Sequence, residues 1–344
     1  MRRGRLEGLL GGRTLSPDAE TVGVSVCHVR RAIRHRCARM STLADKRFVL
    51  VTGKGGVGKT TVCAALAVAY AARGKRVLVA MCNSKEALSG MLGSASIGAE
   101  VARAVDNVWA VNMNPERALE EYGTLVLRSR ILYRTLFDNR YVRAFLRAIP
   151  GMQSWSMLGK AWWHTTERGA DGSRRFDVVI LDAPATGHGL DMVRVPRTIL
   201  DVAPPGILRR DAERAWSLLT DPTATLVALV TLPEDMPVTE TIELAHGLDA
   251  VGLPVGRVVV NGVLAPLFSV EERRALESLD LPKATSVADA VLMSARARAV
   301  RERVQADSLK RLARELPKPT SYLPLVMREM TRPEAIRQLA TRLM

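Results

Sequence analysis

A glycine-rich segment between an apolar run and a helix-forming stretch constrains the fold of this chain more than any other feature. Residues 47–52 (RFVLVT) are typical of a buried strand, and residues 58–73 carry small and apolar side chains at helical spacing. The segment that joins them, and that continues into the start of the predicted helix, is Gly53-Lys54-Gly55-Gly56-Val57-Gly58-Lys59-Thr60-Thr61. A strand, a glycine-rich turn and a helix in this order predict a phosphate-binding loop.

The residue types in this segment suit the binding of a nucleoside triphosphate. Glycines let several backbone N–H groups point at one anion, and the start of the helix adds its positive dipole end. We expect Lys59 to reach the β- and γ-phosphates and the Thr60 hydroxyl to bind Mg²⁺. The predicted nucleotide-binding residues are Gly53, Lys54, Gly55, Gly56, Val57, Gly58, Lys59, Thr60 and Thr61.

Further strands and helices alternate along the chain, which predicts an α/β fold with a mostly parallel sheet flanked by helices on both faces. Residues 115–167 differ, because they carry long and aromatic side chains at helical spacing. We expect a helical subdomain inserted near 115–170, divided by the Pro150-Gly151 pair. The remaining predicted strands are residues 75–82, 107–113, 177–181, 225–231, 257–261 and 321–325.

Charge and cysteine content bear on domains and location. The net charge is +15, and residues 1–39 hold nine arginines against three acidic residues. We therefore expect residues 1–44 to be a basic leader, either disordered or a mis-annotated start before Met40, and residues 45–344 to form the nucleotide-binding domain.

No apolar run approaches the about 18 residues of a membrane-spanning helix. Four cysteines without a C-x-x-C pair are typical of a reducing cytoplasm and argue against a zinc site.

A second motif follows the strand at 177–181. Asp182 ends this strand, where an acidic residue can hold Mg²⁺ beside a phosphate-binding loop. The segment Asp182–Leu190 (DAPATGHGL) resembles the D-T-A-P-T-G-H-T-L segment of the arsenical pump-driving ATPases and of the eukaryotic ATPase that targets tail-anchored membrane proteins. The loop GKGGVGKTT likewise resembles the deviant Walker A loops of MinD, ParA, the nitrogenase iron protein and this ATPase family. The resemblance covers residues 46–344.

This resemblance implies a P-loop ATPase that closes as a dimer on Mg·ATP. It implies that Lys54 acts across the dimer interface, on nucleotide held by the partner subunit, and that Lys59 stabilises phosphate charge. It implies Thr60 and Asp182 as Mg²⁺ ligands. The strand end at Val259-Val260-Asn261 is similar to the family's V-V-N, whose asparagine reads the adenine ring. The dimer partner would be a second copy or a paralogous ATPase.

One position departs from the family. The aspartate that positions the attacking water in the family aligns with Asn83, which can hydrogen-bond water but cannot accept its proton. Since phosphoryl transfer depends mainly on positioning and electrostatics, Asn83 is still expected to orient the water, with slow turnover. Glu86, three residues on, could substitute for the aspartate. The departure keeps open an alternative, in which the chain is a weakly catalytic scaffold or regulator beside a more active paralogue.

The helical insert raises the question of a client. In the tail-anchored targeting ATPase the corresponding helices form an apolar groove for a client membrane segment. Two alternatives exist for the apolar residues of this insert: a similar groove, or packing inside the subdomain or dimer interface. The +15 charge raises a third function, a ParA-like nucleic-acid positioning ATPase, but the segment Asp182–Leu190 argues against it. The apolar residues in question are Met152, Trp155, Met157, Leu158, Trp162 and Trp163.

Overall fold

The computed structural model describes residues 45–127, 151–253, 255–280, 286–326 and 332–343. The chain divides into two units, Met1–Thr42 and Leu43–Met344, and every described residue belongs to the second. The predicted leader, residues 1–44, lies outside the described residues, so the domain boundary stays a prediction.

Within the described residues, eight strands form one sheet in the order β3-β4-β2-β5-β1-β6-β7-β8. All neighbouring pairs are parallel except β3 and β4. The central strands are continuous apolar runs because both of their faces are covered. The strands are β1 (Phe48–Gly53), β2 (Val77–Cys82), β3 (Ala102–Val105), β4 (Val108–Met113), β5 (Val178–Ala185), β6 (Thr225–Thr231), β7 (Arg257–Val263) and β8 (Thr320–Pro324).

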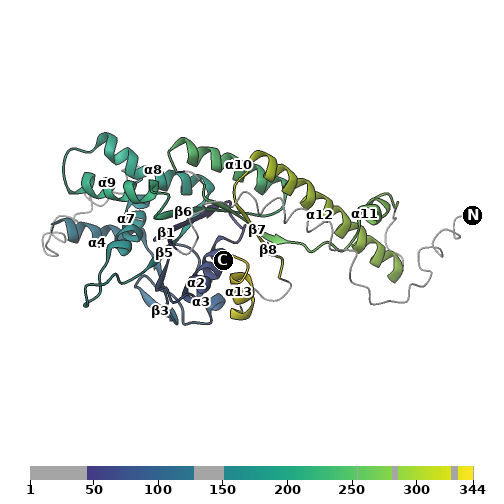
Figure 1. Cartoon of the computed structure of the whole chain (residues 1–344), viewed down its shortest axis with the longest axis horizontal. Coiled ribbons are helices and arrows are strands. Elements are labelled where there is room, and N and C mark those ends of the chain that lie inside the picture. The colour runs from purple at the N-terminus through teal and green to yellow at the C-terminus, as the bar shows by residue number, and fades with distance from the viewer. Residues whose placement is uncertain (1–44, 128–150, 254, 281–285, 327–331, 344) are drawn as a thin grey trace, which may run out of the picture. The chain divides into compact units, whose positions relative to one another are not determined.

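Helices cover both faces of this sheet, as predicted. On one side lie α2, α3 and α13, and on the other lie α8, α10 and α12 (Figure 1). Their bounds are α2 (Lys59–Ala71), α3 (Leu88–Leu92), α4 (Pro115–Leu127), α7 (Met152–Thr166), α8 (Thr186–Val202), α9 (Ile207–Thr220), α10 (Asp235–Ala250), α11 (Val270–Glu277), α12 (Val287–Glu315) and α13 (Pro333–Ala340).

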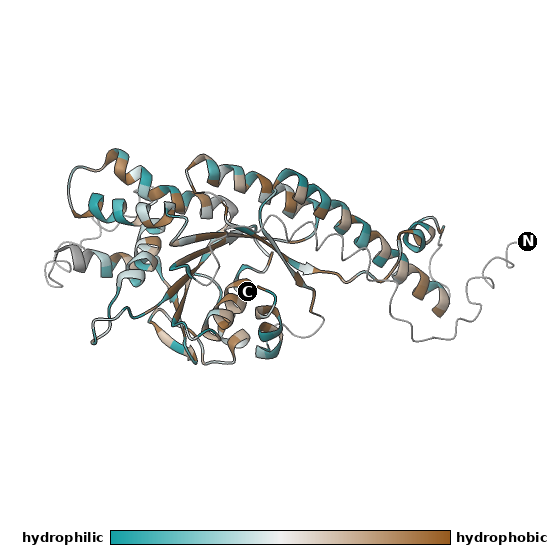
Figure 2. Ribbon diagram, viewed as in Figure 1, coloured by the Kyte–Doolittle hydropathy of each residue, from teal (hydrophilic) through white to brown (hydrophobic). Residues whose placement is uncertain are grey.

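The residues of β1 show how the two faces share the core. Val49 and Val51 join the apolar cluster under α2, whereas Phe48 and Leu50 join the cluster under α8 and α10. This alternation follows from the period of two along a strand. Figure 2 shows the strands coloured as hydrophobic between helices of mixed character. The predicted mostly parallel α/β fold is confirmed.

The helical insert is described in part. Helices α4 and α7 pack on each other, and α7 also packs against α8 and α9. Residues 128–150, which were predicted to belong to the same insert, lie outside the described residues. None of the described helices is long and apolar enough to cross a membrane.

Candidate functional site

The glycine-rich loop joins the end of β1 to the start of α2, as predicted. Gly53 has φ 151°, and a Cβ built on it would lie 2.2 Å from the carbonyl oxygen of Val230 on the adjacent strand β6. Gly58 has φ 89°, and its Cβ would lie 2.3 Å from Nδ2 of Asn261. The backbone conformation therefore requires glycine at both positions, and at Gly53 the Val230 backbone also leaves no room for a side chain.

The start of α2 presents backbone N–H groups to this loop. The helix begins at Lys59 after Gly58, without a side-chain cap and without an acidic residue in its first turn. An uncapped helix start with a positive dipole end suits an anion. Thr61, also predicted to bind nucleotide, is 7% exposed and lies on the buried face of α2, and its role stays a prediction.

The ammonium of Lys59 lies inside the loop. Its Nζ atom donates to the carbonyl oxygens of Gly53 at 3.2 Å and Lys54 at 2.9 Å. Burial lowers the pKa of Lys59, and the nearby charge of Asp182 opposes that effect. The geometry thus holds a partly desolvated cation within the curl of the loop, where phosphate oxygens are predicted to lie.

Thr60 and Asp182 meet beside this lysine. The Thr60 hydroxyl donates to Oδ2 of Asp182 at 2.6 Å. This contact arises from the sheet, because β1 and β5 are parallel neighbours and Val51 is in register with Asp182. Asp182 is 5% exposed, and burial raises its pKa although Thr60, Lys59 and Cys63 act to lower it. Hydroxyl and carboxylate oxygens side by side suit Mg²⁺, which prefers oxygen ligands.

Cys63 packs one turn into α2, next to Asp182. It is fully buried, and burial raises the pKa of its thiol, with the Asp182 charge adding to the effect. The thiol therefore stays neutral, and Cys63 packs as a small buried hydrophobic residue.

Lys54 and Asn261 make contacts that the sequence did not predict. The Lys54 ammonium forms an ion pair with the Glu240 carboxylate of α10 in the same chain. Asn261, within β7, donates from Nδ2 to the carbonyl oxygen of Val57 at 3.0 Å. The asparagine thus braces the phosphate-binding loop. In both contacts the two residues are far apart in the sequence, and only the fold brings them together.

Asn83 lies at the end of β2, on the same edge of the sheet. It is exposed and adopts a left-handed conformation with φ 47°. The next residue, Ser84, exchanges two hydrogen bonds with the Asn112 amide at 3.2 and 2.8 Å. Glu86 accepts from the backbone and hydroxyl of Ser89 at 2.8 and 2.6 Å, so its carboxylate caps α3. Burial acts to raise the Glu86 pKa, but these hydrogen bonds outweigh it and lower the pKa.

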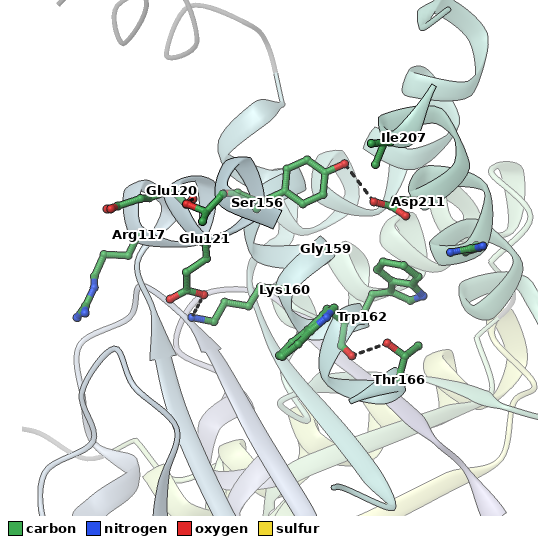
Figure 3. Close-up of a pocket in the computed structure, with 15 residues that line it drawn as sticks. Arg117, Glu120, Glu121, Ser156, Gly159, Lys160, Trp162, Thr166, Ile207 and Asp211 are labelled. Carbon is green, nitrogen blue, oxygen red and sulfur yellow. Dashed lines mark hydrogen bonds and ion pairs between the residues drawn. The ribbon is translucent and has the colours of Figure 1, made fainter. Parts of the chain in front are cut away.

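The helical insert holds a separate cavity of about 670 Å³ between α4, α7 and α9. In Figure 3, Trp162, Ile207 and Asp211 line it together with the Lys160–Glu121 ion pair, whose Nζ and Oε2 atoms are 2.7 Å apart. Of the six apolar residues for which a groove and internal packing were the two alternatives, only the two adjacent tryptophans at 162 and 163 line this cavity. Three others belong to the core, where they are almost fully covered: Trp155, Met157 and Leu158.

Comparisons with known proteins agree with this geometry. The chain matches the model of the anion-transporting ATPase family over residues 46–203 and 208–281. It is 30% identical over 226 residues to the ATPase BagA of Mycobacterium tuberculosis, covering 64% of this chain and 66% of that protein. It is 27% identical over 245 residues to an arsenical pump-driving ATPase of Escherichia coli, covering 67% of this chain and 41% of that protein. The matches leave a third or more of each relative uncovered. The family match spans both the phosphate-binding loop and the Asp182 segment, and the chain therefore belongs to the anion-transporting ATPase family.

Proposed function

We propose that this chain is a Mg²⁺-dependent ATPase that closes as a dimer around ATP and couples hydrolysis to a client. The observation that carries the proposal is the 2.6 Å contact between the Thr60 hydroxyl and the Asp182 carboxylate at the mouth of the phosphate-binding loop. The test is phosphate release from ATP by the full chain, with Mg²⁺ and with excess chelator. Turnover that requires Mg²⁺ is expected, and turnover indifferent to Mg²⁺ would contradict the proposal.

The residues of the loop have distinct tasks in this function. Thr60 and Asp182 would hold Mg²⁺, which when bound neutralises phosphate charge and orients the triphosphate. The Lys59 ammonium would leave two backbone carbonyls for phosphate oxygens, to which a charged donor bonds more strongly. The N–H groups at the start of α2 would bind the same phosphates. Asn83 would hold the attacking water through its amide.

Substituting Asn83 with Asp separates this ATPase from a weakly catalytic scaffold. Positioning and charge stabilisation supply most of the catalysis of phosphoryl transfer, so we expect turnover to change by less than about tenfold. The measurement is steady-state phosphate release by the wild-type chain and the variant at saturating Mg·ATP. A gain above about 100-fold would favour the alternative, a nucleotide-binding subunit whose partner is an active paralogue. Ser84→Ala is the matched control on the same exposed turn.

Substituting Asn261 with Ala tests the role of this residue in adenine recognition. Its Nδ2 atom already donates to Val57, which leaves the amide oxygen to accept from the adenine amino group. We therefore expect the affinity for ATP to fall about tenfold and the affinity for GTP to fall less, since guanine offers a carbonyl at that position. Calorimetric titration of both nucleotides measures the difference. Equal losses would mean that Asn261 only braces the loop.

The dimer partner and the client belong to the same proposal. A second copy or a paralogous ATPase would supply the opposite half of the closed dimer. The cavity between α4, α7 and α9 supports an amphipathic client segment rather than a wholly apolar one, because Trp162 and Trp163 share it with several charged residues: Arg117, Glu120, Glu121, Lys160, Asp211 and Arg214. A membrane partner would present such a segment in the cytoplasm.

A nucleic-acid partner is less consistent with this site, in spite of the +15 charge. Positive charge alone gives salt-sensitive binding to any polyanion and carries no sequence information. The Asp182–Leu190 segment is similar to that of the pump-driving and targeting ATPases rather than to ParA. We therefore propose that nucleic acid is not the client.

A further inference from the structure

The Lys54 ammonium is held by a carboxylate of its own chain, that of Glu240 on α10. The two side chains are 35% and 26% exposed, so water reaches both. An ion pair with this exposure contributes modestly to stability and can exchange partners readily. Lys54 stands on the glycine-rich loop, with Gly55 and Gly56 beside it, so its position can change at small cost.

Glu240, in contrast, is fixed by the packing of its helix. Arg311 of α12 donates to Oδ1 of Asp235 at 3.1 Å and to Oγ1 of Thr239 at 2.8 Å, and thereby ties α10 to α12. Thr241 is buried and donates to the carbonyl of Pro237 at 2.7 Å. The carboxylate is therefore presented from a rigid element, and the lysine is the partner that moves.

We propose that Glu240 is a positioning residue that holds Lys54 back in the open chain, and that Lys54 must exchange this carboxylate for nucleotide phosphate when two subunits close. The inference rests on the proposed function, in which Lys54 acts on nucleotide held by the partner subunit. A contact made only in the open state favours that state by the full free energy of the contact. The ion pair between Lys54 and Glu240 thus raises the free energy that nucleotide binding must supply before two subunits close.

The contact is tested first in the nucleotide-free chain. Lys54 is acetylated with a limiting amine reagent, and its rate of modification is read by mass spectrometry of the full chain. Glu240→Gln is expected to raise that rate about fivefold, the upper range for an exposed ion pair. Glu243→Gln, which removes the same charge from an exposed position of the same helix, is the matched control and leaves the rate unchanged. An equal rate in wild type and Glu240→Gln overturns the proposal.

The exchange is tested second by nucleotide-driven association. Analytical ultracentrifugation with Mg²⁺ and a non-hydrolysable ATP analogue is expected to show association about fivefold tighter for each Glu240→Gln subunit in the complex. Glu243→Gln, which removes the same charge from an exposed position of the same helix, is expected to associate as the wild type does. Equal association of wild type and variant overturns the exchange.

If calorimetry finds no nucleotide binding while the labelling rates differ, the proposed ATPase function fails and the exchange fails with it. Normal nucleotide binding with equal labelling rates overturns the exchange alone.

Discussion

Asp182→Asn is expected to reduce Mg²⁺-dependent ATP turnover by at least about 100-fold, because it replaces the charged side chain that we propose as a Mg²⁺ ligand with a neutral amide. The Thr60 hydroxyl keeps a hydrogen-bond partner in the variant, so the loop is expected to keep its shape. The measurement is phosphate release at saturating ATP over a range of Mg²⁺ concentrations. Asp191→Asn, at a position on α8 whose side chain is 67% exposed, is the control and keeps wild-type turnover.

The same substitution is expected to stabilise the fold at neutral pH. Burial raises the pKa of Asp182, so its ionised form destabilises the folded chain above that raised pKa, and the effect disappears as the pH falls towards the ordinary value of 3.8. We expect the variant to melt about 2 to 4 °C higher at pH 7, with the gap closing towards pH 4. Lower melting of Asp182→Asn at pH 7, by calorimetry without nucleotide, would contradict the interpretation of Asp182 as a carboxylate kept for function at a cost in stability.

Gly53→Ala is expected to have the largest structural effect among the loop substitutions. The added Cβ would lie 2.2 Å from the Val230 carbonyl oxygen, which is backbone of the central strand β6 and cannot move without disturbing the sheet. Overpacking together with an unfavourable φ of 151° is expected to reduce the free energy of unfolding by about 3 kcal/mol or more. Denaturant unfolding of the full chain measures this loss.

Gly55→Ala is the matched control for that measurement. A Cβ at Gly55 would meet only the Cβ of Ala185, at an ordinary 3.8 Å, and the backbone there is not left-handed. We expect its free energy of unfolding to stay within about 0.5 kcal/mol of the wild type. Equal stability of the two variants would show that β1 and β6 do not approach as closely as described, and that the loop does not require glycine at residue 53.

Much of the fold could be predicted from the sequence because buried parallel strands are continuous apolar runs. The predicted strand at 225–231 coincides with β6, and 107–113 differs from β4 by one residue. Strand β3 and helix α8 are among the elements that were not predicted, and both have a physical reason. Strand β3 is short and half exposed, so it lacks the apolar run of a buried strand. The turn at Asn107, with φ 58°, joins it to its partner β4. Helix α8 contains Gly187, Gly189 and Pro196, which oppose helix formation, and tertiary packing overrides them.

In the candidate site, too, one part could be predicted from the sequence and another part could not. The loop from Gly53 to Thr60 is local in sequence, so its motif predicted its position and its shape. The contacts of Lys54 with Glu240 and of Asn261 with Val57 join residues 186 and 204 positions apart, and no local pattern announces them. The contact of Lys54 with Glu240 follows from the packing of α10 against β6, the strand beside β1.

The central claim is that this loop, with Thr60 and Asp182, binds Mg·ATP. Isothermal titration calorimetry of the full chain with a non-hydrolysable ATP analogue tests it directly, with Mg²⁺, with chelator, and with Asp182→Asn in parallel. We predict saturable binding in Mg²⁺ that weakens at least about tenfold both on chelation and in the variant. Absence of saturable binding in the presence of Mg²⁺, or equal affinity under all three conditions, would contradict it.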